Sequence, residues 1–380
     1  MRKIYRQLLT LFLAAVIIAG GGIIVNSRMS QASGEKKQDE AAGVMEVHFI
    51  DVGQGDSTLI TCEGHSMLID TGEATKGTAI QNYLQKQKIN KLDYLILTHP
   101  DSDHIGGAPV IITKFNIDKV FVSNYEKDNK TYMKLIQALD NKHLKQMTPK
   151  VGAKYSLGTA KFTILAPNDT YNNPNDASIA LLIQNGKNRF LFTGDAEEDA
   201  EQDILENGLD LSADVYKAGH HGSRTATSEE FFEAVSPSSA VISCGEDNSY
   251  GHPHAQTLNT FRMNGVKVYR TDEEGTIIAT SDGNKITFNV PESNTWQAGE
   301  PNGNGSVWNA PIQKSDPAKS PAQKDETEKD KVTYVLNTKS KKFHKPSCNS
   351  LPEENNREDS TQSRETIVEQ GYEPCKRCNP

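Results

Sequence analysis

Short apolar segments alternate with polar loops between residues 44 and 290 of this chain. Brief apolar runs bounded by glycine, asparagine or aspartate predict β-strands, and runs with apolar side chains three or four positions apart predict amphipathic helices. We expect strands at 46–50, 57–61, 67–69, 94–98, 119–122, 161–165, 178–183, 189–193, 215–217, 240–243, 267–269, 276–280 and 285–289. We expect helices at 76–87, 105–114, 131–142, 196–207, 228–235 and 255–264. This mixture indicates an α/β protein in which helices cover layered sheets.

The beginning of the chain has the pattern of an export signal. A cationic start precedes a mostly apolar run from Leu8 to Val25, and residues 30–32 offer a small-x-small site for cleavage after Ala32. We predict a signal peptide or membrane anchor at 1–32 and a polar spacer at 33–43. The protein is then expected outside the cell or at the outer face of the cytoplasmic membrane, with membrane contact only through an uncleaved N-terminal segment.

The end of the chain is organised differently. Residues 291–331 are rich in proline, glycine, serine and charged side chains, and this composition predicts a flexible linker. A compact segment resumes at 332–380. At 380 residues, the chain is long enough for two domains. The net charge of −9 argues against binding nucleic acid over a large basic surface, although it allows a local basic patch.

The densest chemical pattern lies directly after the apolar run 92–97. Four potential metal ligands follow within a few positions: His99, Asp101, Asp103 and His104. Aspartate and serine in such a loop are also common helix caps, and this alternative stays open for the segment alone. In an extended turn, three of the four side chains share one side, an arrangement that suits two divalent ions and hydrolysis by a metal-activated water.

Other strands end in the same kinds of side chain. Asp70 follows one apolar run and could orient a ligating histidine, while Asp51 and Asp56 fit either a site or a turn. Asp195 ends another strand, in a position to bridge two metals. Further motifs containing potential site residues lie at 48–57, 175–178, 217–223 and 250–254.

These motifs, in this order, resemble the metallo-β-lactamase fold over about residues 44–290. Within that superfamily they are most similar to the hydrolase domain of the ComEC competence proteins. The resemblance implies an αβ/βα four-layer sandwich with a binuclear centre at one edge. It implies that one metal ion is bound by His99 and Asp101. It implies that the second ion is bound by Asp103, His104 and His221. Asp195 would bridge the two ions.

The resemblance also implies a reaction, in which a metal-bound hydroxide attacks a phosphodiester. Asp103 would orient or deprotonate the water. His220 would contact substrate or a ligand, and the residues expected to bind the scissile phosphate are Lys217, His252 and Ser223. The chain departs from the superfamily pattern because Asp101 replaces a histidine and because 175–178 stands where an isolated ligand histidine is usual. More oxygen ligands favour Mn²⁺ relative to Zn²⁺, and we leave the two metals open.

A second set of ligands lies near the end of the chain. His344 and Cys348 form one close pair, and Cys375 and Cys378 form the other. This spacing predicts a closed tetrahedral zinc site, with a disulfide as the alternative. The segment 332–380 resembles the metal-binding module of the Ada DNA-repair protein, in which cysteine stands at the position of His344. The resemblance with this replacement implies a structural zinc. Neighbouring lysine and arginine side chains could contact DNA phosphates or form a solvated surface.

These patterns lead to one functional hypothesis and two rivals. We predict an exported metal-dependent phosphodiesterase, monomeric and acting on DNA, with two Zn²⁺ or Mn²⁺ ions in the hydrolase domain and one Zn²⁺ in the C-terminal module. The first rival is a hydrolase of another phosphoester, such as a phosphocholine or nucleotide ester. The second rival is a non-catalytic protein that captures DNA.

Overall fold

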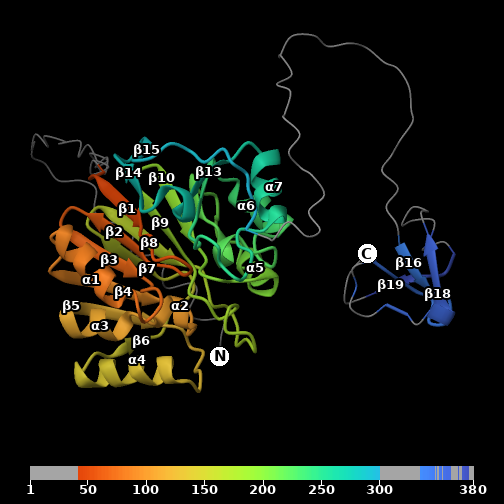
Figure 1. Ribbon diagram of the computed structural model, residues 1–380, viewed down its shortest axis with the longest axis horizontal. Helices are drawn as coiled ribbons and strands as arrows, with labels where there is room; N and C mark the ends of the chain where they lie inside the picture. Colours follow the sequence, from red (N-terminus) through yellow and green to blue (C-terminus); the bar gives the residue numbers. More distant parts are fainter. Residues whose placement is uncertain are drawn as a thin grey trace, which may run out of the picture. The chain divides into compact units, whose positions relative to one another are not determined.

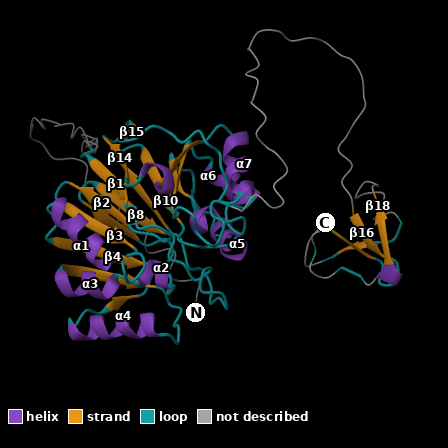
Figure 2. Cartoon of the chain, in the orientation of Figure 1, coloured by secondary structure: helices purple, strands orange, loops and turns teal. Residues whose placement is uncertain are grey.

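Two β-sheets lie face to face in the larger unit of the chain (Figures 1 and 2). The computed structural model describes residues 42–299, 334–346, 348, 351–352, 354–360, 367 and 370–375. In the first sheet the strand order is β15-β14-β1-β2-β3-β4-β5-β6. Its strands are β1 (Met45–Phe49), β2 (Thr58–Cys62), β3 (His65–Ile69), β4 (Lys91–Leu97), β5 (Asn116–Val122), β6 (Gln146–Met147), β14 (Ile277–Ser281) and β15 (Ile286–Phe288).

The second sheet has the order β13-β12-β11-β10-β9-β8-β7. Its strands are β7 (Lys154–Leu157), β8 (Ala160–Ile164), β9 (Leu181–Asn185), β10 (Asn188–Phe192), β11 (Val215–Lys217), β12 (Ser239–Ile242) and β13 (Lys267–Arg270). Both sheets are mixed. Strands β3, β4 and β5 run parallel in the first sheet, and β10, β11, β12 and β13 run parallel in the second.

Alternating side chains explain why both faces of the first sheet are buried. On β4, Tyr94 and Ile96 point into the core between the sheets, and Leu95 and Leu97 point to the helices on the other face. A strand covered on both sides needs apolar residues at consecutive positions, as this run has.

Helices cover the two outer faces. Those on the first sheet are α1 (Gly77–Lys86), α3 (Ala108–Lys114) and α4 (Lys130–Asn141), and those on the second are α5 (Glu198–Glu206), α6 (Glu229–Val235) and α7 (Ala255–Met263). Ile80 and Leu84, four positions apart on α1, are fully buried, and each contributes about 1.5–3 kcal/mol. Short helices complete the unit: α2 (Ser102–Ile105), α8 (Thr271–Glu274) and the 3₁₀ turn η1 (Gly219–Gly222). The predicted four-layer αβ/βα sandwich is confirmed.

Local differences from the predicted elements have physical reasons. The expected helix at 105–114 is divided into α2 and α3 at Gly106 and Gly107, because glycine is a poor helix former. The backbone also approaches Thr71 closely here, since a Cβ at Gly107 would lie 2.3 Å from its carbonyl oxygen. Ordered packing also continues beyond residue 290. The amide of Ser293 donates to the Val268 carbonyl at 2.7 Å, and the amide of Gly299 donates to the Pro253 carbonyl at 3.0 Å.

The second unit is a small sheet of order β18-β16-β17-β19. Its elements are β16 (Tyr334–Asn337), β17 (Lys342–His344), η2 (Glu354–Asn356), β18 (Arg357–Ser360) and β19 (Glu373–Pro374). Its apolar cluster contains only Tyr334, Leu336, Phe343, Ile367 and Tyr372 among the described residues. A core of this size gives little stability, and a bound metal would add to it.

Three predictions fall wholly or largely outside the described residues. They are the segment 1–32, most of the spacer and linker, and the ligand Cys378. Within the described ranges, none of the helices has the length and apolar character needed to span a bilayer.

Candidate metal centre

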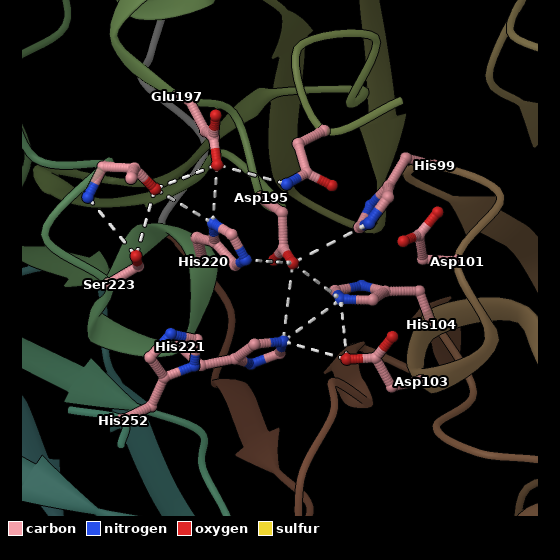
Figure 3. A network of polar contacts seen from close by, with 12 residues as sticks. His99, Asp101, Asp103, His104, Asp195, Glu197, His220, His221, Ser223 and His252 are labelled. Carbon is pink, nitrogen blue, oxygen red and sulfur yellow. Dashed lines mark hydrogen bonds and ion pairs between the residues drawn. The ribbon is translucent and has the colours of Figure 1, made fainter. Parts of the chain in front are cut away.

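The candidate site lies where loops from both sheets meet (Figure 3). His99 and His104 follow β4 of the first sheet, Asp195 follows β10 of the second, and His221 lies in η1 directly after β11. These loops follow the carboxyl ends of parallel strands, which lie at the same edge of a sheet. The fold therefore collects side chains that are far apart in the sequence.

Two histidines direct one ring nitrogen each toward a common point. Nδ1 of His104 donates to Oδ2 of Asp70 at 2.8 Å, and Nδ1 of His221 donates to the carbonyl of Ser243 at 2.9 Å. A neutral imidazole carries one proton, so each Nε2 then carries a lone pair. The two Nε2 atoms face each other at 3.3 Å. Lone pairs at that distance repel unless a proton or a metal cation lies between them.

Carboxylates complete this group. Oδ2 of Asp195 lies 3.3 Å from Nε2 of His104 and 3.5 Å from Nε2 of His221, while Oδ2 of Asp103 lies 3.3 Å from Nε2 of His221. One ligand atom each from Asp56, His104, Asp195 and His221 lies within 4.8 Å of all the others. The buried Oδ1 atoms of Asp56 and Asp195 have no hydrogen-bond partner. Such unsatisfied oxygens and converging nitrogens fit a divalent metal ion.

His99 extends the group on the other side of Asp195. Its Nε2 is buried, has no hydrogen-bond partner and lies 3.7 Å from Oδ2 of Asp195. Burial, together with the nearby His104, lowers the pKa of His99 to about 4, so its ring is neutral and can act as a ligand. Asp195 thus lies between the two predicted metal positions, where a bridging carboxylate is expected.

Asp101 is engaged by a cation of the protein itself. Its Oδ1 accepts from Nζ of Lys127 at 2.6 Å. The first predicted metal position therefore has one neutral histidine and a carboxylate already paired with lysine. The second position has two histidines and more than one carboxylate, and the donor set fits a metal better there.

The electrostatics of the cluster are those of a site prepared for positive charge. Burial favours neutral His104, but the carboxylates of Asp195, Asp70 and Asp103 outweigh it and raise the pKa of that ring well above its usual value. Burial likewise opposes ionisation of Asp195, yet His104 and His221 hold the pKa of this carboxyl well below its usual range. In the metal-free protein, protonated histidine therefore stabilises the ionised carboxylates, and a bound metal ion would displace the histidine protons.

The structure corrects the role predicted for Lys217. Nζ of Lys217 donates to Oδ2 of Asp56 at 2.9 Å and to the Ala218 carbonyl at 3.0 Å, and only 3% of the lysine side chain is exposed. A buried ammonium held in this way cannot reach a substrate phosphate. It instead holds Asp56 beside His221, whose Nδ1 lies 4.0 Å from Oδ1 of Asp56.

His220 and His252 lie beside the candidate ligands Asp195 and His221. Nε2 of His220 is 3.7 Å from Oδ2 of Asp195, and its Nδ1 is 3.1 Å from Oε1 of Glu197. His220 and His221 have φ values of 48° and 55°, a left-handed conformation that is costly for such residues and is concentrated at functional sites. The ring of His252 lies 5.3 Å from that of His220, and burial with His221 and His220 lowers the pKa of His252 to about 3.

Two further predicted residues have structural partners. Oγ of Ser223 lies 3.0 Å from Oγ1 of Thr225, which donates to Glu197. Oδ1 of Asp176 accepts from the backbone amide of Glu197 at 3.0 Å. Asp176, in the motif 175–178, therefore caps the loop that precedes α5, and it is not among the residues of the metal cluster.

The C-terminal unit holds a second cluster. Ligand atoms of His344, Cys348 and Cys375 lie within 4.8 Å of one another, and all three residues are buried. Nδ1 of His344 is 3.4 Å from Sγ of Cys348, and neither described cysteine is in a disulfide. Three of the four predicted ligands therefore meet, and the fourth, Cys378, lies outside the described residues.

Sequence reasoning left one contribution to the main site open and missed two others. Asp56 was equally consistent with a turn, while Lys127 and Glu197 belong to no recognisable motif. The only local signal was Gly55 before Asp56. At φ 129°, a Cβ on Gly55 would lie 2.4 Å from the Asp103 carbonyl oxygen, so this loop approaches the site closely.

Comparison with known proteins agrees with this geometry. The chain is 31% identical to ComE operon protein 3 of Bacillus subtilis over 64% of this chain and 34% of that protein. It is 33% identical to Recombination protein 2 of Haemophilus influenzae over 62% of this chain and 28% of that protein. The chain thus spans about a third of the length of these curated relatives.

A solved structure, the metallo-beta-lactamase fold protein YhfI from Bacillus subtilis, is 14% identical, with a TM-score of 0.44, and the match covers 63% of this chain and all of that one. The family model of the metallo-beta-lactamase superfamily matches residues 50–246, which contain every residue of the cluster around Asp195. Competence protein ComA of Neisseria gonorrhoeae is 31% identical over 60% of this chain and 31% of that protein. With the family match and the two-sheet sandwich that carries the cluster, the chain belongs to the metallo-beta-lactamase superfamily.

Proposed function

We propose that this protein is an exported phosphodiesterase that cleaves DNA. The observation that carries the proposal is the convergence of the Nε2 atoms of His104 and His221 on Asp195, with His99 on its opposite side. The names of two relatives, Recombination protein 2 and Competence protein ComA, refer to recombination and competence, which supports DNA as the substrate class. Bound divalent ions would supply an activated water and stabilise negative charge on a phosphoryl group.

The chain's own residues have separate roles in this proposal. His99, Asp101, Asp103, His104, Asp195 and His221 hold the metals. The side chain of Asp103 is 22% exposed, whereas His104 and His221 are almost fully buried, so water reaches the cluster past Asp103. Burial raises the pKa of Asp103, but His104 and His221 outweigh it and keep this carboxylate ionised. Asp103 can therefore accept a hydrogen bond from water and orient it.

His220, with 20% of its side chain exposed, faces the substrate side of the site. Glu197 fixes the ring of His220, and the side-chain amides of Asn173 and Asn175 donate to the two oxygens of Glu197 at 3.0 and 3.2 Å. A histidine held in this way can hydrogen-bond a substrate oxygen with little loss of side-chain freedom. The ring of His252 is only 4% exposed, so it packs against His220 and Tyr250 instead of contacting substrate.

The remaining predictions extend this function. The cationic and apolar N-terminal pattern supports export of the protein, which we expect to act as a monomer. The cluster of His344, Cys348 and Cys375 supports a structural zinc in the C-terminal module, with Cys378 as fourth ligand. We propose that this module helps to hold DNA through the basic side chains around its ligands.

Metal-dependent cleavage by the full chain is the test. The metal-free protein is supplied with Zn²⁺ or Mn²⁺ and given single- or double-stranded DNA, alongside Asp195→Asn and the matched exposed variant Asp140→Asn. We expect cleavage that Asp195→Asn abolishes and Asp140→Asn retains. Metal-dependent binding of DNA without cleavage would support the DNA-capture alternative.

A smaller phosphoester is the second candidate substrate. A cavity of about 380 Å³ beside Gln54 is lined by Asp51, Glu246 and Asp272, with Lys76 as its cation. This acidic lining does not favour a polyanionic strand. Hydrolysis of a nucleotide or phosphocholine ester with no cleavage of DNA would establish this candidate and reject the nuclease.

A further inference from the structure

An exposed aromatic ring stands next to the metal cluster. The side chain of Tyr250 is 64% exposed, and it is the one aromatic residue among the exposed large hydrophobic side chains of the described part of the chain. An exposed tyrosine adds little to a core, so its position beside the site calls for another account.

The ring of Tyr250 is connected to the site by direct ring contacts. It stacks on His252 with a centroid distance of 5.7 Å and an interplanar angle of 19°. His252 in turn lies 5.9 Å from the ring of His221 and 5.3 Å from that of His220. One side of Tyr250 therefore faces the buried histidine, and the exposed remainder faces solvent at the border of the metal cluster.

The loop that carries Tyr250 is held in place by one side chain. Oδ1 of Asn248 accepts from the amides of Tyr250 and His252 at 3.2 and 3.0 Å. Its Nδ2 donates to the carbonyls of Gly245 and His252 at 2.9 and 2.6 Å. The ring is thus presented on a fixed backbone, which lowers the entropy lost when a ligand stacks on it.

We propose that Tyr250, supported by His252, is a stacking platform for a nucleobase next to the scissile phosphate, and that the site therefore takes single-stranded nucleic acid. The inference rests on the proposed nuclease function and specifies its substrate. Aromatic side chains bind unpaired bases of any sequence by stacking. In a duplex both faces of a base are covered by its neighbours, so only an unpaired or displaced base can use this ring.

Charge repulsion keeps the phosphate backbone of a bound DNA strand away from the cavity beside Gln54. Asp272 in its lining is paired with Arg270 at 2.6 Å, which leaves the carboxylates of Asp51 and Glu246 against Lys76. Phosphates would be repelled there, whereas a neutral base on Tyr250 would not. The platform therefore contributes affinity for bases, and the metal cluster contributes affinity for phosphate.

Binding of two matched single-stranded probes, one with bases and one without, tests the platform. Fluorescence anisotropy measures the affinity of the full chain carrying Asp195→Asn for a short single-stranded DNA and for an abasic strand of equal length. Adding Tyr250→Ala is expected to weaken binding of the normal strand about tenfold and to leave binding of the abasic strand unchanged. Tyr250→Phe keeps the ring and should bind within about twofold of the parent, as should Met263→Ala, which removes an exposed apolar side chain at the end of α7.

The outcomes separate the platform from the proposed function. If Tyr250→Ala weakens binding of the normal and the abasic strand equally, or weakens binding of neither, the proposed stacking platform is wrong. Cleavage of DNA by the unmodified enzyme would then still support the nuclease proposal. If the enzyme neither binds nor cleaves DNA but hydrolyses a small phosphoester, both proposals fail.

Discussion

Replacing Asp70 by asparagine tests how the second metal position is built. Oδ2 of Asp70 accepts from Nδ1 of His104 at 2.8 Å, and its Oδ1 accepts from the Thr98 amide at 2.8 Å. Asparagine can keep the bond from Thr98 through its carbonyl oxygen. Its NH₂ group then faces His104 and donates to Nδ1, so the ring proton moves to Nε2, the atom that faces the metal.

The expected effect is a loss of metal affinity without loss of the fold. Residue 70 has φ 56°, and asparagine tolerates this left-handed conformation as well as aspartate does. Removing a carboxylate that orients a ligating histidine typically costs 10–100-fold in affinity, or about 1.4–2.7 kcal/mol. The loss should fall on the position that contains His104 and His221.

Zinc titration of the metal-free full chain against a chromophoric chelator measures this effect. Asp140→Asn, the same chemical change on the exposed face of α4, serves as control, and circular dichroism checks that each variant is folded. Zinc affinity within about twofold of the unmodified protein would refute the orienting role of Asp70, because its loss should cost at least tenfold.

Three further predictions address other parts of the molecule. Nearby carboxylates raise the pKa of His104 against the effect of burial, so protons compete with a metal ion for this ring, and zinc affinity should rise with pH until the folded-state pKa is passed. The stabilisation that protonated His104 gives the metal-free protein is complete below pH 6.5 and is lost as pH rises through the folded-state pKa. Calorimetry across this pH range checks the direction of both effects. Lys217→Met leaves the Asp56 carboxylate buried and unpaired and should lower the free energy of unfolding by about 3–5 kcal/mol, measured in urea. Adding Asp56→Asn should restore much of this loss, whereas equal stability of Lys217→Met and the parent would contradict the buried ion pair. Chelation of metal in the full chain should make Cys348 and Cys375 react rapidly with a thiol reagent while Cys62 stays protected in its core, and thiol reactivity that is indifferent to chelation would argue against a metal at that cluster.

The elements of the sandwich could be predicted because their signal is local. On β4 and β10 the apolar runs are long enough to define strands, and the paired apolar positions of α1 define its buried face. The four layers followed from the alternation of these elements and from the resemblance. The short strands β6 and β7 were not predicted, because their side chains are largely exposed or half-buried and carry little apolar pattern.

The candidate ligands could be predicted for a related reason. A histidine or carboxylate directly after a buried strand has few structural uses, so His99, His104 and Asp195 were distinctive in the sequence alone. Other residues of the same motifs gave no such signal when the residue they pair with lies far away in the sequence. Lys217 was assigned to substrate because its motif gave no sign of Asp56, with which it pairs across 161 positions.

The sequence by itself determined which residue types stand at the strand ends, and so the kind of chemistry this protein can support. Only the tertiary structure decided which charges neutralise one another: Lys217 with Asp56, Lys127 with Asp101, and Glu197 with His220. The physical reason is that hydrophobic periodicity is set by the nearest few positions, whereas the free energy of a buried charge depends on whichever group the fold brings within a few ångströms.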